Sequence, residues 1–303
     1  MATNDNSTPD EPFGAASSWR VMAAACTSAK FQTDDASLMR LGENALFHLP
    51  RAQAVVRIAR SMDYWADAVK EVNVSRWLDG HRFPAAEICE TDQPIQIEGH
   101  PVTFWKFIEG RPGDTSDVAI LGRTLRRLHA IPDPKDFKLP PKDALGRVRP
   151  RISKAPIPES DRKFLLNRLD KLAADLPRLE YKLDPSPTHG DAHVKNLMIR
   201  NDNPVLIDLE RFAYGQPEWD LAVTATEYST AKWWTDDQYR NFVDAYGYDV
   251  MTWDGFSTLR AVNELSMTTW LMQNVAESAE IAGEYELRMR TLRGEGSPRW
   301  KPF

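Results

Sequence analysis

The block of residues 188–222 constrains the fold of this chain more than any other segment. Two apolar runs around a polar turn predict a β-hairpin over residues 197–207. Asn196 lies just before the first predicted strand, and Asp208 lies at the end of the second. Both side chains can therefore face the loop that precedes the hairpin and carries Asp191.

Three oxygen-bearing side chains that converge on one loop suit phosphoryl transfer. This reaction mainly requires the alignment of a hydroxyl group and the neutralisation of charge on a triphosphate. A carboxylate such as Asp191 takes or orients the hydroxyl proton. An amide oxygen and a second carboxylate, here Asn196 and Asp208, hold Mg²⁺, which prefers hard oxygen ligands. The competing interpretation is that all three are ordinary turn residues.

The spacing of this block is specific. His-x-Asp-x-x-x-x-Asn, from His189 to Asn196, matches the catalytic loop of protein kinases, and Asp208 stands where their second metal-binding Asp follows. From average composition, this spacing arises by chance in roughly one chain per hundred of this length. The additional Asp at a strand end makes coincidence rarer still.

The chain resembles the aminoglycoside phosphotransferase family, the small-molecule branch of the protein-kinase-like fold. Protein kinases usually have Arg between the His and the Asp, whereas this family has Gly, as at Gly190. Residues 215–222 (GQPEWDLA) are similar to the family's G-x-P-x-x-D-L-A segment, and residues 121–129 to its helix ending in Leu-His. The resemblance extends from about residue 38 to residue 290.

The resemblance implies an α+β, bilobal, protein-kinase-like fold, with a small β-sheet N-lobe containing one helix and a larger, mainly helical C-lobe. Residues 1–15 are polar, and we expect them to form a flexible arm. We expect a nucleotide-binding N-lobe over residues 16–110 and a catalytic and acceptor-binding C-lobe over residues 111–303. The breaker cluster at 109–113 marks the boundary.

Hydrophobic periodicity and breaker residues predict the elements of both lobes. In the N-lobe they predict a hairpin from residues 41–49 and 54–58 around Pro50, a helix over 63–79 ended by Gly80, and strands at 95–97 and 101–108. In the C-lobe they predict helices near 118–128, 160–176, 236–246 and 255–292, interrupted by a Pro-rich stretch at 131–158. The capping-box sequence at 235–238 favours a helix start there.

The resemblance also assigns residues to a nucleoside triphosphate, ATP or GTP. Arg57 corresponds to the cation that grips the triphosphate, where many relatives have Lys, and Glu71 to the helix glutamate that pairs with it. An ordinary solvated ion pair is the alternative for these two. The phosphate-covering loop and the hinge that binds the adenine edge through its backbone are assigned to Gly42, Asn44, Lys106, Phe107 and Ile108.

Within the block, the resemblance makes Asp191 the catalytic base and Asn196 and Asp208 the ligands of Mg²⁺. His189 and Asp220 are expected to brace the catalytic loop. For His189, a satisfied loop histidine without a further role is the alternative. We find no internal repeat.

The acceptor is expected to lie between the Asp191 loop and the C-terminal helices, where the sequence is acidic and rich in Trp. Glu227 and Glu264 are candidates for contacts with it. They permit an aminoglycoside or other antibiotic, a sugar-containing metabolite or an amino alcohol, although a solvated acidic face and a Trp-containing core are the plainer alternative. The sequence leaves open the hydroxyl that is modified, the oligomeric state, and a role in resistance, biosynthesis or catabolism.

Composition excludes several other classes of function. The net charge of −6 argues against a nucleic-acid partner, and no apolar run reaches the roughly 18 residues of a membrane span. Only Cys26 and Cys89 are present, which favours a reducing compartment such as the cytoplasm.

A protein kinase is less favoured because residues 208–210 read Asp-Leu-Glu rather than Asp-Phe-Gly. A non-catalytic nucleotide-binding pseudokinase is less favoured because every catalytic position is filled.

Overall fold

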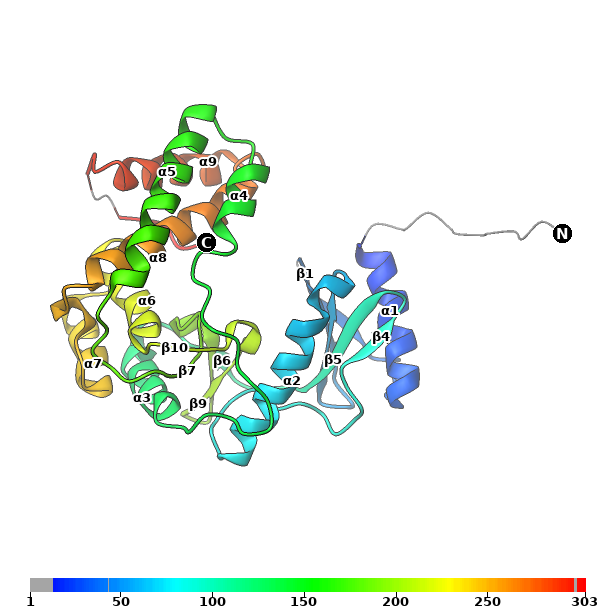
Figure 1. The fold of residues 1–303 in the computed structure, drawn as a ribbon. Helices are drawn as coiled ribbons and strands as arrows, with labels where there is room; N and C mark the ends of the chain where they lie inside the picture. Colours follow the sequence, from blue (N-terminus) through cyan, green and yellow to red (C-terminus); the bar gives the residue numbers. More distant parts are fainter. Residues whose placement is uncertain (1–12, 43, 297–298) are drawn as a thin grey trace. The chain divides into compact units, whose positions relative to one another are not determined.

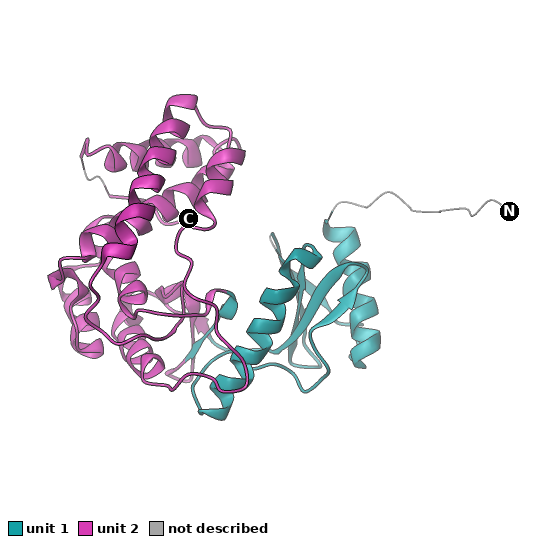
Figure 2. Ribbon diagram, in the orientation of Figure 1, with its two compact units in different colours: residues 1–110, 205–210 teal, residues 111–204, 211–303 magenta. Residues whose placement is uncertain are grey.

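The chain divides into two compact units (Figure 2). The computed structural model describes residues 13–42, 44–296 and 299–303. The first unit runs to Gly110 and also contains Val205–Glu210, and the second contains Arg111–Pro204 and Arg211–Phe303. Each unit has a hydrophobic core of its own.

A five-stranded antiparallel sheet forms the centre of the first unit, with the strand order β1-β2-β3-β5-β4. The predicted hairpin is confirmed, since Phe47 pairs with Val56 and Leu46 with Arg57. The strand at Ser37–Leu41, which ends before the turn at Gly42, was not predicted as a strand of its own from the sequence. The strands are β1 (Ser37–Leu41), β2 (Asn44–Leu49), β3 (Ala54–Ala59), β4 (Ile95–Ile97) and β5 (His100–Lys106).

Two helices, α1 (Ala15–Ala29) and α2 (Trp65–Gly80), lie on opposite faces of this sheet (Figure 1). Successive side chains of a strand point to opposite faces. Val56 therefore joins the apolar core beneath α1, whereas Arg57 points to the other face and meets α2. This alternation places one cation on the α2 side of an otherwise apolar strand.

Helix α1 was not predicted from the sequence, which indicated a single helix in this lobe. Its start at Ala15 falls at the end of the expected arm, of which residues 1–12 lie outside the described residues. The buried face is made by Val21, Met22, Ala25 and Cys26. Because the segment is mostly Ala and Ser, only a few large apolar side chains mark its helical periodicity.

The second unit is mainly helical, and its core is formed largely by four helices that pack together. The predicted helices α3, α5 and α7 are confirmed, and Gln238 N donates to Thr235 Oγ1 at 3.2 Å in the predicted capping box. The helices are α3 (Val118–His129), α4 (Val148–Lys154), α5 (Glu159–Asp175), α6 (Glu218–Ser229), α7 (Asp236–Tyr246), α8 (Phe256–Leu271) and α9 (Ala279–Leu292).

Three features of this unit differ from the sequence-based expectation. The helix expected over residues 255–292 is two helices, α8 and α9, because Ser278 caps a new helix through a bond from Ile281 N. Helix α4 lies in the stretch expected to be broken by Pro, and α6 begins directly after Pro217. Proline fits the first turn of a helix, so its presence there did not exclude either element.

Short strands carry the chain into and out of the Asp191 loop, defined here as residues 189–196. Strand β7 (Ser186–Thr188) leads into this loop and pairs with β10 (Ala213–Gly215), and β6 (Arg111–Pro112) pairs with β8 (Leu197–Arg200). Strand β9 (Asn203–Leu206) follows β8. Leu206 N donates to Pro84 O at 2.9 Å, and the end of β9 from Val205 onward belongs to the first unit.

In the parts of the chain that the structure describes, no helix has both the length and the apolar character needed to cross a membrane.

We expect Phe47→Ala to destabilise the first unit strongly. Phe47 is fully buried between α1 and the sheet, and truncating such a side chain costs about 3–5 kcal/mol in the free energy of unfolding. Met39, which is 53% exposed on β1, is the matched control, and Met39→Ala should change that free energy by less than about 0.5 kcal/mol. Urea unfolding measures both values, and equal effects would contradict the assigned core.

Candidate active site

The buried carboxylate of Asp220 holds the start of the Asp191 loop. Asp220 is fully buried in the first turn of α6. It accepts hydrogen bonds from His189 N at 2.7 Å and Gly190 N at 2.8 Å, and its Oδ2 lies 3.1 Å from His129 Nε2. Burial opposes its charge, but the bond with His129 and nearby basic groups outweigh this effect and lower the pKa of Asp220. The carboxylate thus stays ionised and fixes two successive peptide groups.

Gly190 can adopt its position in the loop only because it has no side chain. Its φ is +83°, a left-handed conformation. A Cβ atom there would lie 2.2 Å from the backbone oxygen of Arg211 and 2.9 Å from Lys142 Nζ. Steric crowding and the left-handed backbone therefore explain why the residue between His189 and Asp191 is glycine.

Asp191 follows this glycine, and its own peptide is fixed on both sides. Its N–H donates to His189 Nδ1 at 3.3 Å, and its carbonyl accepts from Asn196 Nδ2 at 2.8 Å. His189 is itself buried and packs edge-on against Phe212, with ring centroids 5.5 Å apart. The structure thus brings together three residues singled out in the sequence, His189, Asp191 and Asn196.

The Asp191 side chain is partly exposed and surrounded by basic groups. Its carboxylate is 38% exposed and lies 3.7 Å from Arg211 Nε. Partial burial tends to raise its pKa, but the basic neighbours outweigh burial and hold the pKa below its ordinary value. These neighbours are Arg211, His193, His189 and Lys142. Asp191 is therefore an ionised carboxylate at neutral pH, able to accept a proton or a hydrogen bond.

Two of these basic residues, Arg211 and Lys142, were missed by the sequence analysis. Lys142 donates from Nζ to the carbonyl oxygen of Gly190. Nothing in the Pro-rich sequence around residue 142 indicates this contact. Arg211 follows the Asp-Leu-Glu run directly, and its position after Asp208 was the one signal that could have pointed to it.

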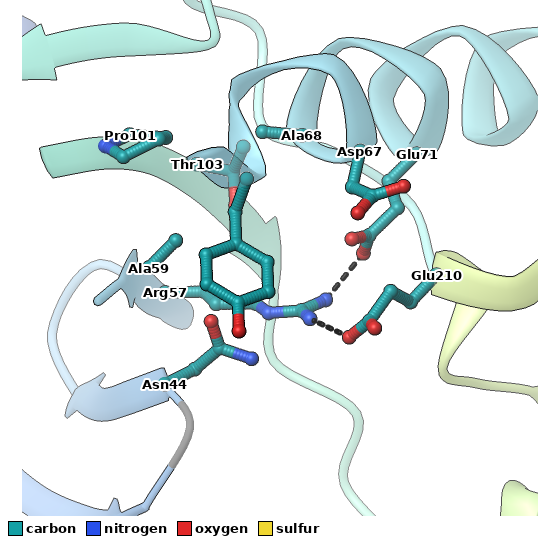
Figure 3. A pocket seen from close by; sticks show the side chains of 10 residues that line it. Asn44, Arg57, Ala59, Asp67, Ala68, Glu71, Pro101, Thr103 and Glu210 are labelled. Atoms are coloured by element: carbon teal, nitrogen blue, oxygen red, sulfur yellow. Dashed lines mark hydrogen bonds and ion pairs between the residues drawn. The ribbon is translucent and has the colours of Figure 1, made fainter. Parts of the chain in front are cut away.

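In the first unit, Arg57 lies at the centre of a polar pocket (Figure 3). Arg57 Nη1 donates to Glu71 on α2, and Arg57 Nη2 donates to Glu210 Oε2 at 2.9 Å. In the amide orientation that satisfies both of its polar atoms, Asn44 also accepts from Arg57 Nη2 at 3.0 Å. The structure thus brings together the predicted residues Arg57, Glu71 and Asn44.

Electrostatics in this pocket keep Arg57 charged. Burial disfavours the guanidinium cation, but Glu71, Glu210 and Asp208 outweigh this and raise the pKa of Arg57. Burial also raises the pKa of Glu71 above its ordinary value, against the opposing effect of Arg57. Arg57 is therefore attracted by the carboxyl groups of Glu71, Glu210 and Asp208, and burial makes Glu71 easier to protonate than an ordinary carboxyl.

Glu210 was not assigned a role from the sequence, although it is the third residue of the Asp-Leu-Glu run. Asp208, two residues earlier, is exposed and has a φ of +62°. A left-handed backbone at a residue other than Gly is uncommon and often accompanies a functional position. Asp208 belongs to the first unit and Asn196 to the second, so their shared role stays a prediction.

Backbone groups of the predicted phosphate loop and hinge form hydrogen bonds within the first unit. Gly42 N donates to Asn44 O, and Arg60 Nη2 donates to Gly42 O at 3.1 Å. At the hinge, Lys106 N donates to Glu87 O and Phe107 N to Gln53 O at 2.7 Å. These two backbone donors are therefore already used, and the role of the hinge in binding the adenine edge stays a prediction.

The two acidic residues predicted to contact the acceptor have unlike surroundings. Glu264 accepts from Thr230 Oγ1 at 2.8 Å and forms ion pairs with Arg168 and Arg260. Glu227 accepts from Trp234 Nε1 at 3.0 Å, and burial raises the pKa of its carboxyl to about 8. The charge of Glu264 is balanced within the protein, whereas that of Glu227 is suppressed by burial.

We expect Gly190→Ala to lower the free energy of unfolding by about 1–3 kcal/mol, since a side chain there strains the backbone and meets a carbonyl oxygen. The matched control is Gly283→Ala in α9, where a Cβ meets nothing within 4 Å. Removing a glycine from a helix interior should stabilise the protein by about 1 kcal/mol. Thermal and urea unfolding report both changes, and a neutral Gly190→Ala would refute the close packing of the loop.

Comparisons with known proteins identify the family and the fold of the chain. The model of the phosphotransferase enzyme family (APH) matches residues 42–261. A search of curated protein sequences found no match. Among solved structures, the amicoumacin kinase hAmiN in complex with AMP-PNP, Ca²⁺ and Ami is 15% identical, with a TM-score of 0.72 over 92% of this chain and 94% of that one.

Two further solved structures have the same fold at low sequence identity. The GDP and kanamycin complex of APH(2'')-IIia is 15% identical, with a TM-score of 0.62 over 91% of this chain and 99% of that one. Choline kinase from Cryptosporidium parvum Iowa II is 14% identical, with a TM-score of 0.62 over 91% and 95%. The expected protein-kinase-like fold is thus confirmed. The chain belongs to the phosphotransferase enzyme family.

Proposed function

We propose that this phosphotransferase transfers the γ-phosphate of ATP or GTP to a hydroxyl group of an amine-bearing small molecule, with Asp191 as the catalytic base. The observation that carries the proposal is the Asp191 loop, in which a partly exposed, ionised carboxylate follows a backbone held by Asp220. Such a carboxylate can orient an incoming hydroxyl and accept its proton as the bond to phosphorus forms.

Arg57 is the proposed contact with the triphosphate. Its guanidinium is fixed by Glu71 and Glu210 and is only 18% exposed, so it is positioned before any ligand arrives. Glu71, Glu210 and Asn44 already take donors from both of its terminal nitrogens, so the proposed contact is a charge-assisted hydrogen bond to a phosphate oxygen rather than a pair of parallel bonds. Both ATP and GTP stay possible donors, because the similar structures include complexes with AMP-PNP and with GDP.

Asn196 and Asp208 are the proposed ligands of Mg²⁺. Asn196 Nδ2 is engaged by the carbonyl of Asp191, which leaves its oxygen for a cation, and Asp208 offers an exposed carboxylate. Among the described residues no group of three His, Cys, Asp or Glu side chains forms a metal site. When bound, the ion would neutralise charge on the phosphates.

Glu227 supports an acceptor that carries an amine. A buried carboxyl whose pKa is about 8 is uncharged at neutral pH, and a cation bound beside it would restore its charge. Asp191 contributes to this raised pKa, so the two acids lie within electrostatic reach of each other. An amino alcohol or aminoglycoside could place its hydroxyl at Asp191 and its amine at Glu227.

A cytoplasmic location is part of the proposal. Cys26 and Cys89 are both free thiols in the structure, and unpaired cysteines are typical of a reducing compartment.

Asp191→Asn should abolish transfer while nucleotide binding is kept. The amide preserves the shape of the side chain but cannot accept the hydroxyl proton, so we expect kcat to fall by about 100- to 10,000-fold. ADP release from Mg·ATP is measured with kanamycin, choline and related aminoglycosides and amino alcohols, and mass spectrometry detects the added phosphate. Nucleotide affinity is measured separately by calorimetry.

Asp244→Asn, a change on the exposed face of α7, is the control for that substitution and should keep wild-type turnover. Full activity of Asp191→Asn would overturn the assigned mechanism. Phosphate that appears on protein instead of a small molecule would point to a protein kinase. Tight nucleotide binding without transfer to any acceptor would point to a pseudokinase.

Glu227→Gln should raise the acceptor KM about 10-fold or more, because a charge-assisted hydrogen bond to the amine is lost. The KM for the nucleotide should stay within about twofold of the wild-type value. Glu286→Gln on the exposed side of α9 is the matched control, and it should alter neither constant. An unchanged acceptor KM in Glu227→Gln would remove Glu227 from the acceptor site.

A further inference from the structure

Lys142 makes an unusual contact with the Asp191 loop. The side chain is half-buried, and its ammonium group donates to the backbone carbonyl of Gly190. Burial lowers the pKa of Lys142, and the attraction of Asp220 and Asp191 offsets this only in part. The ammonium thus loses hydration that the Gly190 carbonyl and the nearby carboxylates replace only in part.

The position of Lys142 is fixed by the backbone on either side of it. Tyr214 N donates to Pro140 O at 2.8 Å, and Lys142 N donates to Tyr214 O at 3.1 Å. Pro141 thereby pairs with Tyr214 in parallel orientation, along the edge of β10. The pairing aims the lysine across the short β7–β10 sheet towards the loop that β7 leads into.

Two glycines make room for this side chain. A Cβ on Gly215 would lie 3.1 Å from Lys142 Cβ, and a Cβ on Gly190 would lie 2.9 Å from Lys142 Nζ. Stem and head of the lysine thus each pass a residue that lacks a side chain. The lysine side chain is therefore closely approached at its Cβ and at its Nζ.

The Gly190 carbonyl matters because it belongs to the peptide that joins Gly190 to Asp191. Asp220 holds the N–H groups on the other side of Gly190, and Asn196 holds the carbonyl of Asp191. The N–H of the Gly190–Asp191 peptide makes a long bond of 3.3 Å to His189 Nδ1, and the bond from Lys142 restrains its oxygen. Rotation of that peptide would swing the Asp191 side chain away from its place.

We propose that Lys142 is a positioning residue for phosphoryl transfer, which fixes the Gly190–Asp191 peptide so that the Asp191 carboxylate meets the hydroxyl acceptor. This inference rests on the proposed function of Asp191. Lys142 touches neither substrate nor the transferred group, and its effect passes through the backbone of the loop. Misplacement of a catalytic group by about 1 Å can cost about 100-fold in rate, which sets the scale of the expected effect.

The test uses Lys142→Met, which keeps the length and apolar stem of the side chain and removes the donor. Turnover is measured as Mg·ATP hydrolysis with water as the acceptor, which needs no identified hydroxyl substrate. We expect kcat to fall about 10- to 100-fold, with the KM for Mg·ATP within threefold and the melting temperature unchanged or higher. Lys142→Arg keeps a cationic donor and should retain clearly more turnover than Lys142→Met.

Lys138→Met, an exposed position in the same segment, is the matched control and should behave as wild type. A Lys142→Met protein with kcat within twofold of wild type would overturn the inference. Failure of that variant to fold, or equal losses in Lys142→Met and Lys142→Arg, would also count against it, because the lysine would then serve stability or side-chain shape.

Asp191→Asn, assayed beside these variants, separates this inference from the proposed function. If Asp191→Asn hydrolyses Mg·ATP at the wild-type rate, the catalytic assignment of Asp191 fails, and the role of Lys142 fails with it. If Asp191→Asn is inactive and Lys142→Met is fully active, only the inference about Lys142 fails.

Discussion

The buried carboxylate of Asp220 is the interaction on which the rest of the site depends. A charge removed from water must be compensated by hydrogen bonds, and Asp220 obtains them from two successive N–H groups of the Asp191 loop and from His129. Its place in the first turn of α6 adds the favourable field of the helix N-terminus. The loop cannot leave this conformation without stranding the charge, so the same interaction that stabilises the unit also shapes the loop.

The loop residues could be predicted from the sequence because their chemistry demands fixed residue types at short spacing. His189, Asp191, Asn196 and Asp220 all lie within one block, and Gly190 is required by a left-handed backbone. Lys142 could not be found in this way. It precedes Gly190 by 48 residues and binds a main-chain oxygen, an acceptor that every residue carries and that leaves no mark in the sequence.

The fold was predictable where large apolar side chains recur with a clear period, as in the β2–β3 hairpin and in α3. Helix α1 was missed because its buried face is built partly from Ala25 and Cys26 in a segment of small residues.

The two acidic residues proposed from the sequence to contact the acceptor show a different limit of prediction from sequence. Glu227 and Glu264 look alike in the sequence, and only the structure shows that Arg168 and Arg260 already balance the charge of Glu264.

The groups proposed for nucleotide binding and for base catalysis are held independently of each other. The partners that fix Arg57 are Asn44, Glu71 and Glu210, all in the first unit. The contacts described above that fix the Asp191 loop come from the second unit alone. Each set of groups is thus organised before substrates bind. Neither the nucleotide-binding groups nor the catalytic loop then has to reorganise during the reaction. If the proposed roles hold, substitutions that loosen the Asp191 loop should act on turnover, whereas those around Arg57 should act on nucleotide affinity.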